Sequence, residues 1–208
     1  MGVEEREAEG GERTRGARSR ELVAVAGLFY GLMLAASLAW AHWTDRPLFF
    51  ASARAERLGV DWGGDAALGL GAAALLVVAS RLFTRRTRWG DRSARALAEL
   101  LGPVGLRAAL WLGVVSGVAE EALFRGVLQV ETGWLPASLL FGLAHLAPRR
   151  DLLPWTANAF AAGFLLGALF DVTGNLLAPV LTHSVVNALN LRWLSLHFAE
   201  PGSPPQAA

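Results

Sequence analysis

Long blocks of apolar residues, almost free of charge, divide this sequence and restrict what it can fold into. Hydrophobic residues make up 53% of the 208 positions. They gather in runs of about 20, the length that a helix needs to cross the hydrocarbon core of a bilayer. A soluble domain of this size would interleave polar residues at helical or strand spacing. We therefore predict an all-α fold, a polytopic membrane bundle of about six transmembrane helices.

The predicted spans follow one another with short polar connections. They cover residues 22–41, 66–83, 104–130, 135–147, 152–170 and 176–198. Residues 91–101 have the apolar spacing of an amphipathic helix that lies in the membrane interface. A cleaved signal peptide is the alternative for the first block, because Ala39-Trp40-Ala41 resembles a cleavage site. The block is longer than a usual signal-peptide core and follows an acidic as well as basic tail, so an uncleaved span is favoured.

The charged residues predict location and orientation. The net charge of +1 gives no indication of nucleic-acid binding, and the absence of cysteine excludes disulfides and thiol chemistry. The basic residues, all of them arginine, gather in the tail, in residues 81–107 and at 149–150, which fall on one side of a six-span bundle. By the positive-inside rule, both termini should be cytoplasmic. An Ala, Gly, Leu and Arg-rich composition is typical of a GC-rich bacterial genome, so we expect a protein of the bacterial inner membrane.

A charged cluster lies deep inside the third apolar block. Charged side chains within a span cost several kcal/mol unless they are paired or hydrated. Glu121 and Arg125 are spaced i, i+4 and can pair on one helix face. Glu120 points about 100° away from this pair and has no local cation. An unpaired carboxylate in such a setting is a candidate general base.

Two further spans carry polar groups at the same expected depth. His145 lies one turn after Phe141, and His183 lies one turn before Asn187. A single histidine of this kind is more often packed or interfacial than catalytic, and the second pair could serve interhelical hydrogen bonding. Three spans that each place acid–base or hydrogen-bonding groups inside the membrane nevertheless favour a common site.

These motifs together resemble one family. The segment from Glu120 to Gly126 reads Glu-Glu-Ala-Leu-Phe-Arg-Gly, and it is followed by Phe141-x3-His145 and by His183-x3-Asn187. In order and spacing this is similar to the CPBP family, the CAAX-processing and bacteriocin-processing (Abi) intramembrane proteases. The resemblance covers about residues 100–190, but residues 175–177 depart from the family's usual Ser and Trp. Composition, apolar blocks and this resemblance together divide the chain into a disordered cytoplasmic tail (1–20), N-terminal spans with the interfacial helix (21–99), a protease core (100–198) and a C-terminal tail (199–208).

The resemblance implies a reaction and assigns roles in it. Glu120 and His145 would activate water, His183 and Asn187 would stabilise the oxyanion, and Glu121 with Arg125 would orient the helix. The substrate would be a membrane-anchored protein or peptide, and no cofactor would be needed. Zinc held by Glu120, His145 and His183 is the alternative chemistry. A catalytically silent transporter or immunity-type protein is the alternative class of function.

Overall fold

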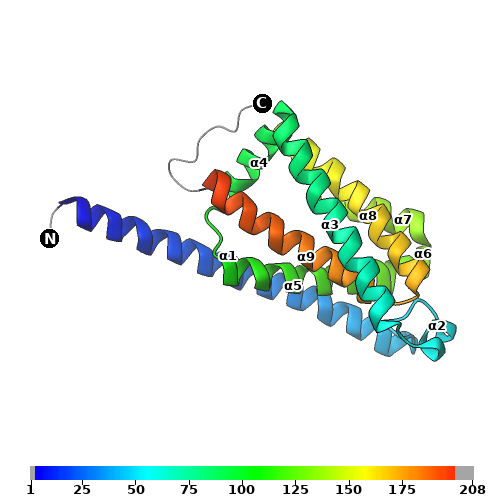
Figure 1. Cartoon of the computed structure of the whole chain (residues 1–208). Helices are drawn as coiled ribbons and strands as arrows, with labels where there is room; N and C mark the ends of the chain where they lie inside the picture. Colours follow the sequence, from blue (N-terminus) through cyan, green and yellow to red (C-terminus); the bar gives the residue numbers. More distant parts are fainter. Residues whose placement is uncertain (1–2, 200–208) are drawn as a thin grey trace.

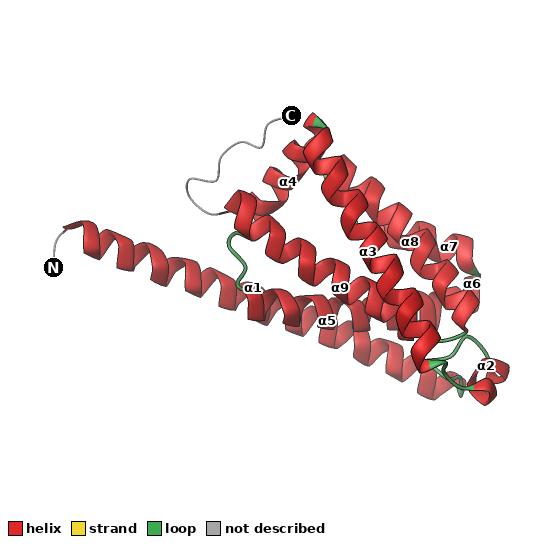
Figure 2. Cartoon of the chain, in the orientation of Figure 1, coloured by secondary structure: helices red, strands yellow, loops and turns green. Residues whose placement is uncertain are grey.

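The protein is a bundle of helices in the computed structural model, which describes the backbone of residues 3–199 and the side chains of residues 21–198. No strand occurs in this described range, which holds only an isolated bridge between Phe50 and Asn175. Figures 1 and 2 show the arrangement. The predicted all-α fold is confirmed. In chain order the elements are α1 (Val3–Thr44), α2 (Ala53–Leu58), α3 (Trp62–Arg86), α4 (Arg88–Leu101), α5 (Leu106–Glu121), η1 (Ala122–Gln129), α6 (Val130–Thr132), α7 (Trp134–Ala144), η2 (Arg150–Leu152), α8 (Leu153–Thr173), α9 (Leu177–Leu194) and η3 (Ser195–Ala199).

Contacts between loops define two opposite ends of the bundle. At one end, Arg46 pairs with Glu131 at 3.2 Å, and the amide of Ala51 donates to the carbonyl of Gly174 at 2.9 Å. At the other end, Arg149 pairs with Glu99 at 3.6 Å, and the amide of Val104 donates to the hydroxyl of Ser195 at 2.9 Å. The chain therefore runs back and forth between these ends through α1, α3, α5–α6, α7, α8 and α9.

The number of long apolar helices is smaller than the six predicted spans. Three helical segments are long and apolar enough to cross a membrane, namely Glu21–Thr44, Trp62–Arg86 and Arg150–Thr173. A fourth is reached if α4 and the helix from Leu106 to Thr132, bent by 100° relative to each other, count as one span. α7 has only 11 residues, about 16 Å of helix, and polar residues interrupt the apolar surface of α9.

The N-terminal end of the chain differs from the prediction, and the predicted C-terminal tail lies almost entirely outside the described residues. Helix α1 begins at Val3, so residues 3–20 are helical where the composition predicts a disordered tail. This segment is rich in Glu and Arg, which propagate a helix well once an adjacent apolar span has nucleated it. The predicted C-terminal tail lies outside the described residues, except for Ala199, which ends η3.

Glycine allows α5 and α9 to approach backbone to backbone. A Cβ atom at Gly113 would lie 2.7 Å from the carbonyl oxygen of Ser184 and 2.8 Å from the amide nitrogen of Ala188. One turn later, a Cβ at Gly117 would lie 2.9 Å from the amide nitrogen of Ser184. This small-x3-small spacing is typical of tightly packed membrane helices. It holds the end of α5, where the charged cluster lies, directly against α9.

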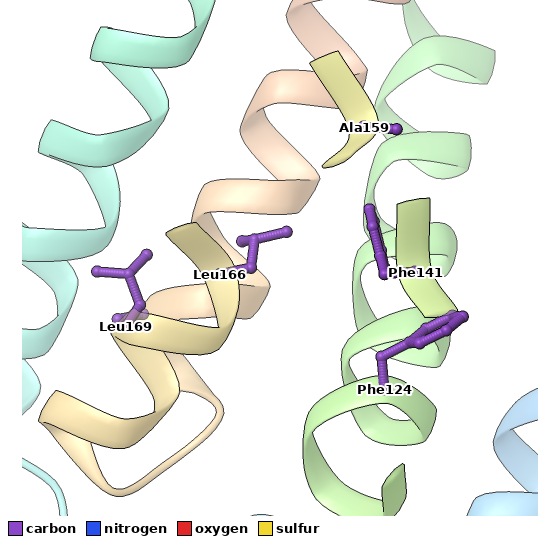
Figure 3. Close-up of a cluster of buried hydrophobic side chains, with 6 residues drawn as sticks. Phe124, Phe141, Ala159, Leu166 and Leu169 are labelled. Atoms are coloured by element: carbon purple, nitrogen blue, oxygen red, sulfur yellow. The ribbon is translucent and has the colours of Figure 1, made fainter. Parts of the chain in front are cut away.

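A buried apolar cluster joins η1, α7 and α8 to the start of α9. Figure 3 shows Phe124 and Phe141 with Leu166 and Leu169 of α8. The rings of Phe124 and Phe141 meet edge to face with centroids 5.1 Å apart. Apolar side chains on the outer surface, such as Leu28, Leu75 and Val172, stay exposed. A soluble bundle would not leave so many apolar side chains in water, so the protein is an integral membrane protein.

We expect Gly113→Ala to separate α5 from α9. The added methyl group would meet two backbone atoms of α9 that cannot rotate away, so the melting temperature in detergent and the yield should both fall. Gly71→Ala on α3 is the matched control, because nothing lies within 4 Å of the added Cβ. Alanine also favours a helix over glycine, so the control should melt at or above the wild-type temperature. Equal melting temperatures for Gly113→Ala and the wild type would show that this contact is not tight.

Candidate active site

The site is built where α5 changes into a π-helical segment. Glu120 and Glu121 end α5, and η1 follows from Ala122 to Gln129 with Arg125 in its middle. Wider turns of this kind occur mostly as short insertions and often at functional sites. Because consecutive helical residues point about 100° apart, the two neighbouring carboxylates face different parts of the bundle.

Glu121 is the centre of a buried chain of polar contacts. Its Oε2 accepts from the Nε of Arg125 at 3.0 Å, and its Oε1 lies 2.7 Å from the Nδ1 of His183 on α9. Glu121 and Arg125 are both 0% exposed. Arg125 also lies over the ring of Phe141, 5.1 Å from its centroid. The predicted i, i+4 pair is present, and it extends to a third helix.

Glu120 faces two histidines from two other helices. Its Oε2 lies 3.6 Å from the Nε2 of His145 and 4.0 Å from the Nε2 of His183. This buried oxygen has no hydrogen-bond partner among the described residues. Glu120 therefore differs from Glu121, whose two oxygens are both engaged. Two imidazoles capable of acid–base chemistry thus converge on one carboxylate oxygen.

His145 is held in place at the end of α7. Its Nδ1 lies 2.8 Å from the carbonyl oxygen of Phe141, so Nδ1 carries the proton and donates. The Phe141 ring stacks on the imidazole at a centroid distance of 4.6 Å, as their spacing predicts, and Trp155 meets it edge-on at 5.4 Å. In neutral His145, Nε2 is consequently an acceptor that points toward Glu120.

Asn187 lies one helical turn away from this convergence. Its Nδ2 donates to the hydroxyl of Ser116 at 2.9 Å, and Ser116 precedes Glu120 by one turn of α5. An amide nitrogen has two donors, so the bond to Ser116 leaves the second available to a ligand. The structure thus brings Glu120, His145 and His183 together and places Asn187 at the edge of the group.

Other polar residues around the site have local partners. Asn175, where the chain departs from the family pattern, is fully buried and donates to Asp65 of α3 at 2.7 Å. Its Oδ1 accepts from the amide of Leu177 at 2.9 Å and so caps the start of α9. This departure ties α9 to α3 without touching Glu120 or the histidines. Ser116, which accepts from Asn187, is a site neighbour that sequence reasoning did not identify, because a lone polar residue in an apolar block does not reveal its partner.

The donor set does not form a ready metal centre. Among the described residues, no three His, Asp or Glu side chains are arranged to hold a metal ion. His183 and Glu121 bond to each other through Nδ1 and Oε1, and Glu121 is further engaged by Arg125. The described residues therefore do not fit a zinc site in this arrangement.

We expect Arg125→Ala to destabilise the fold. The change leaves Glu121 buried without its cation, which costs about 3–5 kcal/mol when one member of a buried pair is removed. Arg95→Ala is the matched control, since Arg95 pairs with Asp91 at the same i, i+4 spacing and the same 3.0 Å, but partly exposed. Exposed pairs contribute at most about 1 kcal/mol. Thermal unfolding in detergent should give Arg125→Ala a clearly lower melting temperature than Arg95→Ala. An equal melting temperature would show that the buried pair contributes no more stability than the exposed one.

The comparisons with known proteins cover the part of the chain that holds this site. Residues 103–189 match the family model described as type II CAAX prenyl endopeptidase Rce1-like. The uncharacterized protein YpbD of Bacillus subtilis (strain 168) is 39% identical over 82 residues, which is 38% of this chain and 42% of that relative. No solved structure matches the chain. The matched segment includes Glu120, Glu121, Arg125, His145, His183 and Asn187 and leaves out α1 to α4. Residues 103–189, which hold the whole predicted site, are thus similar to the Rce1-like family, a branch of the CPBP (Abi) family.

Proposed function

We propose that this protein is an intramembrane endopeptidase that hydrolyses a peptide bond of a membrane-associated protein or peptide. The observation that carries the proposal is the convergence of His145 and His183 on the unpartnered Oε2 of Glu120. The match of residues 103–189 to a family of CAAX prenyl endopeptidases supports peptide hydrolysis as the reaction.

Glu120 and His145 together activate the nucleophilic water in this proposal. Oε2 of Glu120 and Nε2 of neutral His145 are both acceptors, and they face each other without bonding. A water molecule that donates one hydrogen to each acceptor satisfies both. As the water attacks the scissile carbonyl, Glu120 takes its proton and later delivers it to the leaving amine.

His183 and Asn187 stabilise the oxyanion of the tetrahedral intermediate. Nδ1 of His183 donates to Glu121, so Nε2 can donate to an oxyanion only from a doubly protonated ring. Two carboxylates, Glu120 and Glu121, lie beside this imidazolium and balance its charge. The free N–H of Asn187 supplies the second donor. Glu121 and Arg125 act through His183 as positioning residues.

The bilayer and the direction of the chain set where a substrate would be cut. Glu120 lies near the middle of the helix from Leu106 to Thr132, and His145 is the more exposed partner, with 21% of its side chain accessible. α7 ends there, toward the bundle end that carries α4 and the Arg149–Arg150 turn. We propose that this arginine-rich end faces the cytoplasm, and that the substrate approaches from that side.

Two alternatives lead to different observations. In the zinc alternative, Glu120, His145 and His183 must rearrange around a metal, which the present donor geometry does not favour. In the silent alternative, the same groups form a rigid polar core or a proton path. The unpartnered oxygen of Glu120 lies between two imidazoles from two other helices, an arrangement that a structural core does not require, and this favours the enzyme.

Glu120→Gln tests the proposed base. The substitution keeps the size and hydrogen bonding of the side chain but removes its basicity, so turnover should fall about 10²-fold or more with no loss of yield. Membrane-anchored proteins of the host that change electrophoretic mobility in this variant identify substrates for kinetic work. Asn187→Ala should cost about 10² to 10³ in rate, whereas Ser116→Ala, which leaves the amide in place, should cost far less. Near-normal cleavage by Glu120→Gln would refute the mechanism.

Metal removal separates the two chemistries. A glutamate mechanism predicts that strong chelators leave cleavage in detergent intact, because the water is activated by Glu120 and His145 alone. Zinc catalysis predicts loss of activity and recovery when zinc is added back. Metal content of the purified protein, measured by mass spectrometry in parallel, should show no stoichiometric zinc. Zinc-dependent recovery would instead assign the reaction to a metalloprotease.

A further inference from the structure

The face of α3 that packs against α9 ends in an arginine. The buried residues Gly69, Ala73 and Val77 of α3 recur every four positions. Gly69 lies against the backbone of Ala178, where an added Cβ would be 2.7 Å from the carbonyl oxygen. Arg81 is the next position in this series, so its side chain continues the face that α3 turns toward α9. A charged residue at such a position in a membrane helix indicates a functional site.

Arg81 is held between the two helices without a carboxylate partner. Its Nη2 donates to the carbonyl oxygen of Leu189 on α9 at 3.3 Å, and its Cζ lies over the ring of Trp193, 5.3 Å from the centroid. Its Nε is buried and has no hydrogen-bond partner among the described residues. The arginines that form ion pairs in this part of the chain are Arg46, Arg95, Arg125 and Arg149. Within the described range, no acidic side chain therefore balances the charge of Arg81.

Trp193 supplies a second donor beside this charge. Its side chain is 7% exposed, and its buried Nε1 has no hydrogen-bond partner in the described range. Phe198 meets the Trp193 ring edge-on at 5.4 Å, and Arg95 of α4 lies over Phe198 at 5.3 Å. Arg95 thus has the same kind of aromatic contact as Arg81, but Asp91 pairs with it at 3.0 Å. The two arginines of this aromatic cluster differ by one negative charge, which an external anion would supply next to Arg81.

The position of Arg81 suits the headgroup region of a bilayer. It lies one to two turns before the end of α3, about 8 Å along the helix axis. At this arginine-rich end, α4 contacts both α3 and α9 (Figure 1). Val78 and Leu82 of α3 and Leu189 of α9 are exposed apolar neighbours in sequence or contact. Basic sites between membrane helices that are bordered by such side chains are typical of lipid headgroup recognition.

We propose that Arg81 and Trp193 bind the phosphate of an anionic phospholipid where α3, α4 and α9 meet. Nε of Arg81 and Nε1 of Trp193 donate to the phosphate oxygens, and the acyl chains lie along the exposed apolar residues of α3. A zwitterionic lipid carries its own cation beside the phosphate, so it compensates the charge of Arg81 less well. The site is separate from the endopeptidase function proposed above, and α3 lies outside the family segment.

Melting temperatures of the full chain in a neutral detergent test the lipid preference. A ligand that binds only the folded state raises the melting temperature. Phosphatidylglycerol at tenfold excess over its Kd should raise it by about 3 °C, and phosphatidylcholine at the same concentration should raise it clearly less. Inorganic phosphate at this concentration should have no effect, because it cannot bind the apolar surface beside Arg81.

Three variants identify the residues responsible. Arg81→Met removes the charge and keeps an apolar stem, so it should lose the additional rise that phosphatidylglycerol gives over phosphatidylcholine. Arg95→Met is the matched control, because it removes the same charge from the same aromatic cluster but at a position that Asp91 already neutralises; it should respond as the wild type does. Trp193→Phe keeps an aromatic ring and removes one donor to a charged group, so phosphatidylglycerol should bind about tenfold more weakly. Native mass spectrometry of retained lipid measures this affinity even if Arg81→Met does not fold.

Several results would overturn the inference. Equal rises with phosphatidylglycerol and phosphatidylcholine would show that the charge of the lipid is not recognised. An equal loss in Arg81→Met and Arg95→Met would reduce the effect to the net charge of this end of the bundle. A rise with inorganic phosphate as large as that with phosphatidylglycerol would show a site for small anions, and a rise with a short acidic peptide but not with lipid would assign the site to a peptide. None of these experiments measures cleavage, so their outcome is independent of the proposed function.

Discussion

The buried contact chain from Arg125 through Glu121 to His183 is the constraint on which the rest of the structure depends. A carboxylate and a guanidinium that are fully removed from water, inside a membrane bundle, are tolerated only when they are paired. Glu121 is bonded through both oxygens, while Arg125 bonds it through Nε alone and keeps Nη1 and Nη2 without a partner among the described residues. Glu121 can reach His183 at 2.7 Å only because α5 and α9 pack backbone to backbone. Gly113 and Gly117 therefore make this contact possible, because a wider spacing between α5 and α9 would leave one oxygen of Glu121 without its hydrogen-bond partner. The same close contact places Asn187 against Ser116 and turns His183 Nε2 toward Glu120.

The short α7 and the interrupted α9 explain why fewer helices qualify as membrane spans than the six predicted, and both helices carry residues of the candidate site. A helix of 11 residues covers about 16 Å, roughly half of the hydrocarbon thickness. α7 starts beside α6 at one end of the bundle and therefore stops within the bundle, where its last turn presents His145 to Glu120. In α9, His183 and Asn187 lower the apolar character that a span would otherwise show. The features that keep these helices from resembling ordinary spans are those that build the site.

The sequence predicts local relations well and relations between helices less well. The i, i+4 pairing of Glu121 with Arg125 and the stacking of Phe141 on His145 follow from helical spacing alone, and both are present. Spacing cannot predict that His183 would bond Glu121 through Nδ1 while facing Glu120 through Nε2, because this depends on the rotation of α9 against α5. The bond between Asn187 and Ser116 was missed for the same reason: in an apolar helix, a single hydroxyl does not indicate which neighbour it meets. The helical form of residues 3–20 was not predicted. Composition indicates how strongly a segment interacts with water, but it does not indicate whether an adjoining helix extends into that segment.

The two adjacent carboxylates have different surroundings because consecutive residues of a helix point in different directions. Glu120 and Glu121 are consecutive and identical, and both are buried. Their directions differ by about 100°, so Glu121 meets an arginine and a histidine that use both of its oxygens, while Glu120 meets two imidazole nitrogens at distances too long for a bond. Enzymes often assign different roles to paired carboxylates through their environments. Both oxygens of Glu121 are bonded and the side chain is fully buried, whereas Oε2 of Glu120 has no partner among the described residues. We therefore propose Glu120, and not Glu121, as the base, while the bonds of Glu121 stabilise the helix that carries both.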